Sequence, residues 1–323
     1  MFIEFTTVIG CRNNCSYCPQ TKLVHSYFSS SPRRPQILTL QNFKKILHQI
    51  PQNIEINFSG FSEPFQNSDC TDMIIYAHQQ GYIVNIYTTL RGLTIKSFKK
   101  IIENISFKNS KKSRFIIHLP SEDKSEHIPV NQTYLKLLTT IINSKINVSY
   151  TYLGDNLSTQ VEKLLNQHHL HVHYAKTISR AGNLSLNKIK TPQLKSKQLN
   201  CGNYQNSLRG HVILPDGTVV LCCMDYGLKH VLGNLLTHNY TDILNSPELK
   251  KVLLGLKNPQ ANTLCRHCEL ATSDNQRSKN NHPSKKHLKN KLKLFLFYRV
   301  RFLYKFLSNI KYKFIPFKVS DKK

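Results

Sequence analysis

Strand-like and helix-like segments alternate almost without interruption over the first 180 residues of this chain of 323 residues. The strand-like segments are short and rich in Ile, Val, Phe and Tyr, and are predicted at 2–9, 54–60, 82–89, 114–120, 146–153 and 170–178. Helices are predicted between them at 39–50, 68–80, 94–105, 131–144 and 158–169. Strands that alternate with helices form parallel βα units, so the predicted fold class is α/β. The pattern alone leaves open whether the sheet closes.

Three cysteines follow the first predicted strand, in the segment C-R-N-N-C-S-Y-C that contains Cys11, Cys15 and Cys18. Three thiolates on one loop can hold three irons of a [4Fe–4S] cluster and leave the fourth iron open. A structural metal site uses four protein ligands, so a site that is one ligand short is suited to chemistry. A zinc knuckle or a group of unrelated surface thiols is the alternative interpretation.

The spacing C-x3-C-x2-C, with the aromatic Tyr17 before the last cysteine, resembles the signature of the radical SAM enzymes. The resemblance implies a partial (β/α)6 TIM-like barrel with its chemistry at the C-terminal ends of the strands. It also implies that the open iron binds the amino and carboxylate groups of S-adenosylmethionine (SAM). One electron from the cluster would then cleave SAM and release a 5′-deoxyadenosyl radical.

The end of the second predicted strand, Asn57-Phe-Ser-Gly-Phe-Ser-Glu-Pro64, resembles the G-x-x-E-P element of the same family. The resemblance implies that Gly60, Ser62 and Glu63 bind the methionine part of SAM. Glycine permits a close approach of the backbone, and a glutamate can accept hydrogen bonds from an ammonium group. A plain strand-to-helix turn is the alternative.

Polar residues at later strand ends extend the predicted cofactor site. The resemblance implies that Tyr17 and Thr88 bind SAM, and that Arg180 meets the cofactor carboxylate or the substrate. Threonine is also common in strands for steric reasons, and an arginine can simply end a strand at the surface. His118 ends the fourth strand and, with Arg180, is a candidate catalytic residue. A histidine satisfied within the core is the alternative for His118.

A second set of cysteines follows a predicted linker at 183–200. It has the pattern C-x15-G-x4-C…C-x2-C, made by Cys201, Cys222, Cys265 and Cys268, and a Pro-Asp-Gly turn within it predicts a β-hairpin. The pattern resembles the auxiliary-cluster domain called SPASM and its shortened form, twitch. It implies a small α+β domain at 201–272 with a second [4Fe–4S] cluster, whose full set of four ligands suits electron transfer. A zinc site made by the same thiols is the alternative.

Cys222 and Cys223 are neighbours on a predicted strand, so their side chains should face opposite sides and only one should reach the cluster. The glycine spacing of the SPASM pattern favours Cys222. Cys70 and Cys223 are predicted to be buried small residues.

The basic charge is concentrated at the C-terminus. Residues 277–323 hold 15 Lys and Arg against one acidic residue, about half of the formal net charge of +27. This distribution favours an attachment segment over a basic catalytic groove. In the predicted tail at 273–323, residues 285–315 place Phe and Leu at helical spacing among basic residues, which predicts a helix on an anionic membrane surface. An acidic partner, RNA and packing against the barrel are the alternatives.

The resemblance implies a radical SAM oxidoreductase that abstracts hydrogen from a sugar, cyclitol or glycan substrate. The auxiliary cluster would accept the remaining electron, and a flavodoxin or ferredoxin would supply electrons. Among twitch proteins, the cysteine layout is most similar to that of the 2-deoxy-scyllo-inosamine dehydrogenases, which oxidise an aminocyclitol alcohol. Fold-level analogy does not fix the substrate.

Two other functions remain open at this point. A SPASM-type peptide maturase is the first alternative, which we rank lower because the cysteine triplet begins at residue 11 and leaves no room for a recognition domain before it. A non-catalytic iron–sulfur or zinc scaffold at a membrane or on RNA is the second. The absence of a signal peptide and of a long apolar run predicts a cytoplasmic protein, peripheral on the inner membrane face.

Overall fold

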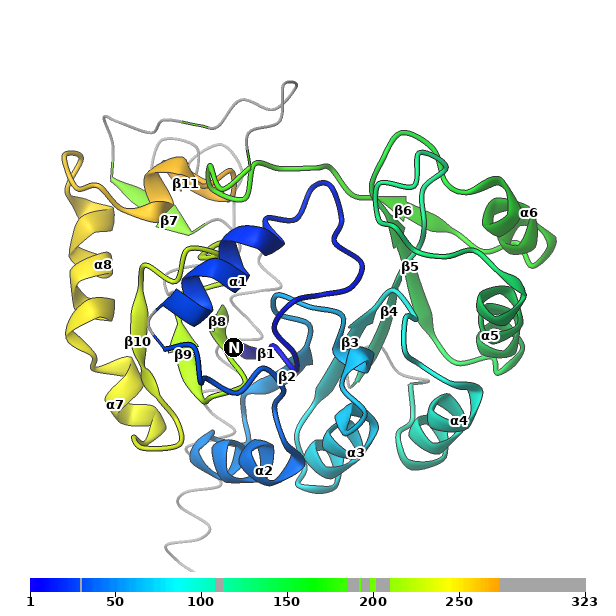
Figure 1. The fold of residues 1–323 in the computed structure, drawn as a ribbon, viewed down its shortest axis with the longest axis horizontal. Coiled ribbons are helices and arrows are strands. Elements are labelled where there is room, and N and C mark those ends of the chain that lie inside the picture. The colour runs from blue at the N-terminus through cyan, green and yellow to red at the C-terminus, as the bar shows by residue number, and fades with distance from the viewer. Residues whose placement is uncertain (30, 108–112, 185–191, 193–197, 202–209, 274–323) are drawn as a thin grey trace, which may run out of the picture. The chain divides into compact units, whose positions relative to one another are not determined.

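The computed structural model describes residues 1–273 except 30, 108–112, 185–191, 193–197 and 202–209. A mixed nine-stranded sheet with the order β10-β9-β8-β1-β2-β3-β4-β5-β6 runs through this part of the chain (Figure 1). Most of the predicted linker at 183–200, and the tail apart from Ser273, lie outside the described residues.

Six strands that follow one another along the chain form the partial barrel, and neighbouring strands pair in parallel. They are β1 (Phe2–Phe5), β2 (Glu55–Phe58), β3 (Val84–Thr88), β4 (Arg114–His118), β5 (Val148–Tyr152) and β6 (Val172–Tyr174). Each pairs in parallel with the next, whereas β6 and β1 do not pair with each other. The sheet is therefore an open partial barrel, and the predicted α/β class is confirmed.

Five helices connect these strands and cover the outer face of the sheet (Figure 1). They are α2 (Leu40–Gln49), α3 (Cys70–Gln79), α4 (Ile95–Asn104), α5 (Gln132–Asn143) and α6 (Thr159–Gln167). Three begin at a side chain that accepts a hydrogen bond from the backbone of the first turn, namely Thr39, Thr94 and Asn131. Such caps satisfy an amide that has no partner within the helix, which explains where these helices begin.

One further helix, α1 (Gln20–Ser29), follows the cysteine loop and was not expected from the sequence. It lies on the concave side of the sheet (Figure 1). Leu23 and Tyr27 are fully buried and pack with Val212 and Tyr226 in a small apolar cluster. The helix thereby ties the cysteine loop to the C-terminal module.

The C-terminal module extends the sheet beyond β1. Strand β8 (Gly210–Ile213) pairs in parallel with β1, while β9 (Thr218–Val220) and β10 (Val231–Asn234) continue antiparallel. The predicted hairpin is thus confirmed. Gly217 in its turn has a φ of +83°, and a Cβ there would lie 2.6 Å from Asn234 Oδ1, so the turn requires glycine.

The remaining elements of the module lie beside this hairpin. They are α7 (Tyr240–Leu244), α8 (Pro247–Lys257), the 3₁₀ helix η2 (Leu264–His267) and an antiparallel pair of β7 (Leu199–Cys201) with β11 (Ala271–Ser273). Within the described residues, every helix is too short or too polar to cross a membrane.

Candidate active site

A cavity of about 270 Å³ lies where β2, β3, β4 and β5 end. All of the residues predicted for the SAM site line it, together with the two catalytic candidates: Cys11, Cys15, Tyr17, Cys18, Gly60, Ser62, Glu63, Thr88, His118 and Arg180. The parallel topology explains this convergence, because the C-terminal ends of parallel strands meet at one edge. Tyr226 brings the C-terminal module into the same wall.

The cysteine loop is shaped by two short turns. The Asn14 N–H donates to the Cys11 carbonyl at 3.2 Å, and the Cys18 N–H donates to the Cys15 carbonyl at 2.9 Å. Asn14 adopts a left-handed φ of 45°, which asparagine tolerates better than most residues. The Ser16 N–H is fixed from outside the loop by the Ser125 carbonyl at 2.8 Å.

Each of the three sulfurs has a polar neighbour. Gln66 Nε2 lies 3.4 Å from Cys11 Sγ, and Gln20 Nε2 lies 3.3 Å from Cys18 Sγ. The Tyr226 hydroxyl is also 3.3 Å from Cys18 Sγ. Cys15 Sγ donates to a backbone carbonyl at 3.5 Å. Donors aimed at sulfur are among the contacts by which a protein tunes an iron–sulfur cluster.

Two of these thiols, Cys11 and Cys15, resist ionisation in the metal-free chain. Burial raises the pKa of Cys15 to about 12, and the nearby Cys18 and Cys11 add to the effect. Burial also raises the pKa of Cys11. A bound metal centre would favour the thiolate forms of these cysteines, because a coordinated thiol is deprotonated outright. Across the described part of the chain, no three His, Cys, Asp or Glu side chains are gathered around a single ion position. The three thiols are free and line one cavity, so thiol ligands for an iron–sulfur cluster are present there.

Gly60 gives the second loop of the cavity its shape. Its φ is +62°, and a Cβ there would lie 2.3 Å from Thr6 Oγ1. The next amide, Phe61 N–H, donates to the same Thr6 oxygen at 3.1 Å. The hydroxyl of Ser62 is buried and has no hydrogen-bond partner among the described residues, so it is free to bind a ligand.

Glu63 is held by the end of β3. One carboxylate oxygen accepts from Thr88 Oγ1 at 2.7 Å, and the other accepts from Thr89 Oγ1 at 2.7 Å and from the Thr89 N–H at 2.6 Å. Burial raises its pKa, although these bonds oppose the shift. Thr88 thus positions Glu63 at the cavity wall, a relationship that the sequence did not reveal.

Glu4 on β1 was not predicted as a site residue. Its Oε2 accepts from the Ser59 hydroxyl and the Gly60 N–H, each at 3.2 Å. Burial raises its pKa to about 7, against the opposing effects of these bonds and of Cys223 and Arg180. The sequence did carry a signal for Glu4, because it is the only acidic residue in a mostly apolar predicted strand. An acidic side chain is rarely buried unless it has a partner.

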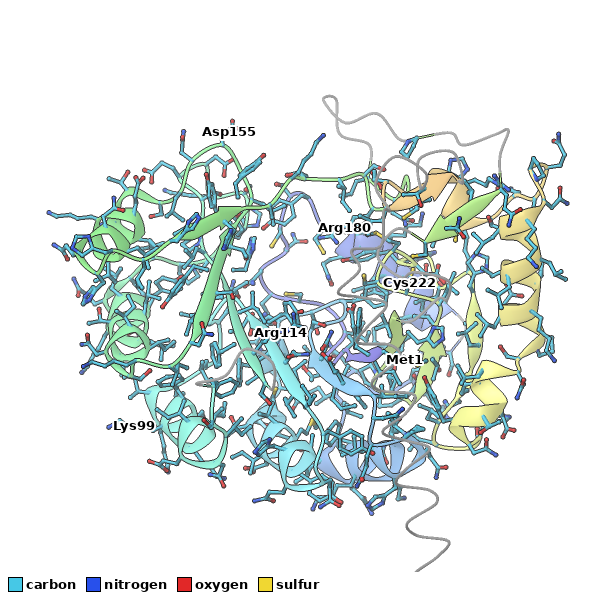
Figure 2. The ribbon with its side chains drawn as sticks, turned by 180° about the vertical axis from the view of Figure 1, so that it is seen from behind. Met1, Lys99, Arg114, Asp155, Arg180 and Cys222 are labelled. Carbon is cyan, nitrogen blue, oxygen red and sulfur yellow. The ribbon has the colours of Figure 1, made fainter. Side chains whose placement is uncertain are left out.

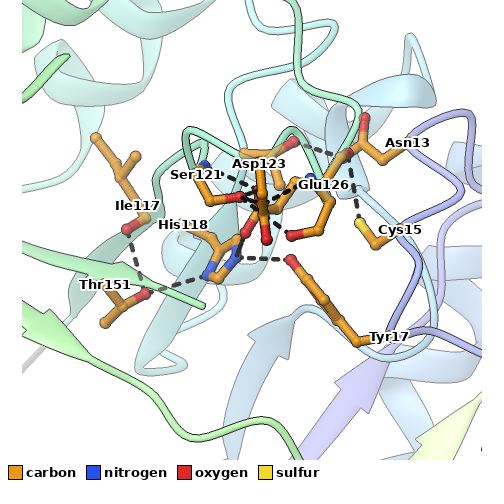
Figure 3. Close-up of polar contacts among 11 residues, drawn as sticks. Asn13, Cys15, Tyr17, Ile117, His118, Ser121, Asp123, Glu126 and Thr151 are labelled. Atoms are coloured by element: carbon orange, nitrogen blue, oxygen red, sulfur yellow. Dashed lines mark hydrogen bonds and ion pairs between the residues drawn. The ribbon is translucent and has the colours of Figure 1, made fainter. Parts of the chain in front are cut away.

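His118 is the centre of a polar network on the opposite wall (Figure 3). Its Nε2 lies 3.0 Å from the Tyr17 hydroxyl and 3.7 Å from Glu126 Oε1, and its Nδ1 lies 3.5 Å from Thr151 Oγ1. Glu126 also accepts hydrogen bonds from the Ser121 hydroxyl and from the Ser121 N–H. Burial raises the pKa of Glu126, but the contacts with His118 and Ser121 outweigh it and leave the pKa lowered. Glu126 was missed because nothing near it in the sequence marks it.

Arg180 approaches the cavity after β6 and can be followed in Figure 2. Its guanidinium has no hydrogen bond or ion pair with a described residue. Burial opposes its charge, but the nearby Tyr226 and Cys223 outweigh burial and raise its pKa. An unpaired cation at the cavity wall is suited to a carboxylate ligand.

The second set of cysteines lies in three segments of the module. Cys201 ends β7, Cys265 lies in η2 and Cys268 follows it. Burial raises the pKa of Cys265 to about 12, with Cys268 and then Cys201 as the next causes. Burial is also the main cause of the raised pKa of Cys222, and Cys265 contributes. Cys201 pairs with Ala271 across β7 and β11, and the Ala271 N–H donates to the Cys268 carbonyl at 3.1 Å, so these two cysteine segments lie side by side.

The prediction that Cys222 and Cys223 lie on a strand is wrong. Strand β9 ends at Val220, and the two cysteines lie in the turn beyond it. The Asp225 N–H donates to the Cys222 carbonyl at 3.0 Å, which closes the turn. Their side chains still diverge: Cys222 packs against the large core, as Cys265 does, and Cys223 packs against the small cluster that contains Tyr226.

Comparisons with known proteins agree with this architecture. The family model for SPASM, an iron–sulfur cluster-binding domain, matches residues 201–269. Streptococcus suis SuiB bound to precursor peptide SuiA is similar in structure with a TM-score of 0.53 and 13% identity, covering 83% of this chain and 70% of that one. Native anSMEcpe with bound AdoMet has a TM-score of 0.50 and 10% identity, covering 83% and 86%.

A structure of BtrN in complex with AdoMet and 2-DOIA has a TM-score of 0.49 and 17% identity, covering 85% of this chain and 94% of that one. A comparison with curated protein sequences finds no match. The expected fold, an open α/β partial barrel, is shared with these solved structures, and the expected SPASM pattern is matched over residues 201–269.

Proposed function

We propose that this protein, which joins a radical SAM-type barrel to a SPASM domain, is an enzyme that reductively cleaves SAM to a 5′-deoxyadenosyl radical. One observation carries the proposal. The three thiols of C-x3-C-x2-C share a single cavity with the Gly60 loop and with an unpaired arginine, Arg180. Thiols for a cluster, hydrogen-bonding groups for an ammonium and a cation for a carboxylate are the groups that a chelated amino acid needs.

Different residues of this chain would bind the cluster and the amino and carboxylate groups of SAM. Cys11, Cys15 and Cys18 would hold a [4Fe–4S] cluster, which supplies the electron for SAM cleavage when bound. The free Ser62 hydroxyl and the Glu63 carboxylate would receive the amino group of SAM, with Thr88 and Tyr17 completing the cofactor site. Arg180 would pair with the carboxylate.

Cys201, Cys222, Cys265 and Cys268 would hold a second [4Fe–4S] cluster in the module. Four thiolates leave no iron open to substrate, so this group suits electron transfer. The match of residues 201–269 to an iron–sulfur cluster-binding domain supports this assignment over a zinc site.

For the substrate, we favour a hydroxyl-bearing sugar, cyclitol or glycan that is oxidised at one carbon. In such an oxidation the group bound in the cavity would take the hydrogen atom of that carbon, His118 would take the hydroxyl proton, and the group held by the auxiliary cysteines would take the remaining electron. These three losses convert an alcohol into a ketone. His118 suits the proton, because it lines the cavity and its Nε2 lies 3.7 Å from the buried Glu126 carboxylate.

A peptide substrate is the second candidate, because SuiB, whose fold this chain shares, was solved with its precursor peptide. Anaerobic incubation with SAM, a strong reductant and a panel of aminocyclitols, sugars and peptides separates the two. Consumption of an aminocyclitol or sugar with formation of a carbonyl supports the oxidase. Modification of peptides alone would favour the maturase.

We further propose that the protein works in the cytoplasm, receives electrons from a flavodoxin or ferredoxin, and uses residues 285–315 to bind an anionic membrane surface. The charge pattern of the sequence supports the membrane contact, and that segment lies outside the described residues. Deletion of residues 285–323 should release the protein from vesicles containing anionic lipid. Equal sedimentation of both forms with these vesicles would contradict the membrane contact.

A further inference from the structure

The turn that carries Arg180 has an unusual backbone. Arg180, Ala181 and Gly182 have φ values of 54°, 55° and 78°, so three consecutive residues are left-handed. Left-handed backbone is unfavourable for residues with a Cβ, and such a turn persists only where its surroundings hold it. Within the described chain, two contacts reach this turn from distant segments.

The first contact is made by Glu269, which directly follows Cys268. Its carboxylate accepts a short hydrogen bond from the Ser179 N–H and another, at 3.2 Å, from the Ala181 N–H. The two bonds enclose Arg180 on both sides, and they are charge-assisted, which makes them stronger than bonds between neutral groups. Ser179 is fully buried, so water does not replace this acceptor easily.

The second contact comes from the other cysteine segment of the module. Asn183 Nδ2 donates to the Arg180 carbonyl at 2.6 Å and to the Met224 carbonyl at 2.7 Å. Met224 lies two residues after Cys222. The Arg180 turn is therefore held by two segments of the module. One carries Cys222 and precedes α7, and the other carries Cys268 and follows α8.

We propose that Glu269 is a positioning residue that holds Arg180 at the cofactor cavity and thereby couples the auxiliary cysteine site to SAM binding. This inference rests on the proposed function, because it takes SAM as the ligand of the cavity. Occupation of the auxiliary site fixes Cys268 and Cys222, and with them Glu269 and Met224. The Arg180 turn is then ordered before SAM arrives, which lowers the entropy that binding must remove. Coupling of this kind is reciprocal between the two sites.

The test measures SAM affinity by titration calorimetry on the anaerobically reconstituted protein, without reductant. Glu269→Gln should weaken SAM binding on the order of tenfold, since the amide removes the charge that both backbone donors use. Glu269→Asp, which keeps the charge, should lose less. Glu103→Gln, on the exposed face of α4, is the matched control and should bind SAM as the wild type does.

A second measurement uses no activity and no cofactor. Hydrogen exchange of the amides at 179–183 in the cluster-free protein should be faster in Glu269→Gln than in the Glu103→Gln control. A double-mutant cycle with Cys265→Ala then tests the coupling. Cys265→Ala alone should weaken SAM binding. Adding Glu269→Gln to Cys265→Ala should weaken SAM binding less than Glu269→Gln does in the wild-type background.

Wild-type binding of SAM together with an unchanged affinity in Glu269→Gln would overturn the positioning role alone. Additive effects of Glu269→Gln and Cys265→Ala would overturn the coupling between the sites. A wild-type protein that binds no SAM would refute the proposed function, and the coupling with it. Unchanged exchange at 179–183 would separately show that Glu269 does not hold the turn.

Discussion

The Gly60 N–H donates a hydrogen bond to Glu4 Oε2 at 3.2 Å, and so joins the loop at the end of β2 to the floor of the barrel. Glu4 is almost fully buried, and burial raises its pKa to about 7. The carboxyl therefore takes up its charge near neutral pH, in contact with Ser59 and Gly60, which line the candidate cavity. This arrangement makes the stability of the protein sensitive to pH at one identified residue.

Stability should fall as pH rises through the interval between the ordinary and the raised pKa of Glu4, from 4.5 to about 7. Here the folded state holds a proton that the unfolded state has released, so ionisation favours unfolding. The full effect is about 3 kcal/mol, at about 1.36 kcal/mol for each pKa unit. Urea unfolding of Glu4→Gln and wild type at pH 5 and pH 8 measures it. Glu4→Gln should lose less stability over this interval, and equal losses would contradict the assignment.

Gly60→Ala should destabilise the protein and weaken SAM binding, because its Cβ would lie 2.3 Å from Thr6 Oγ1 at a φ of +62°. Gly81→Ala is the matched control, because its φ is +87° but nothing lies within 4 Å of the added Cβ. The control should cost about 1 kcal/mol of backbone strain, and Gly60→Ala clearly more. Thermal unfolding compares the two, and equal shifts would show that the contact with Thr6 is relieved without cost.

Cys222→Ser should lower the iron content from about eight to about four atoms per chain, whereas Cys223→Ser should leave it unchanged. The reason is that Cys222 packs in the same core as Cys265, while Cys223 faces the small cluster around Tyr226. Iron and sulfide assays after anaerobic reconstitution decide the question. Loss of iron in Cys223→Ser with retention in Cys222→Ser would reverse the assignment of the ligand.

His118→Gln should slow substrate oxidation about 100-fold, the usual contribution of a general base, while SAM cleavage without substrate continues. Thr151→Val is the control, because it removes the 3.5 Å contact at Nδ1 and a 3.4 Å bond to the Ile117 carbonyl, but leaves the Tyr17 and Glu126 neighbours of His118 in place. The ratio of product to 5′-deoxyadenosine is the measurement. Equal ratios in wild type and His118→Gln would remove His118 from the proton transfer.

Periodicity and spacing predicted the elements whose signals lie within a short window. All six barrel strands and the five outer helices are present within a few residues of the predicted bounds. Helix α1 was missed although Gln20, Leu23 and Tyr27 share one buried face, because it directly follows the cysteine loop. Helix α7 was missed although Asn239 and Asp242 form a capping box, a signal that can be recognised in sequence.

The family resemblance predicted residues that line the cavity, but not the residues that hold them in position. Glu126 lies 3.7 Å from His118. Glu269 holds the turn around Arg180, although the two residues are 89 positions apart in the sequence. Such pairs leave no pattern in a single sequence, because neither partner predicts the position of the other. Only the fold, which brings strand ends and module together, reveals these relationships.

The central claim is that Cys11, Cys15 and Cys18 hold the cluster that cleaves SAM. The most direct measurement is 5′-deoxyadenosine formed by the anaerobically reconstituted protein with SAM and dithionite, compared with Cys15→Ala and with Cys70→Ala, a buried cysteine outside both sets. We expect 5′-deoxyadenosine from the wild type and from Cys70→Ala, and none from Cys15→Ala. A wild-type protein that contains zinc in place of iron and leaves SAM intact would contradict it, as would continued cleavage by Cys15→Ala.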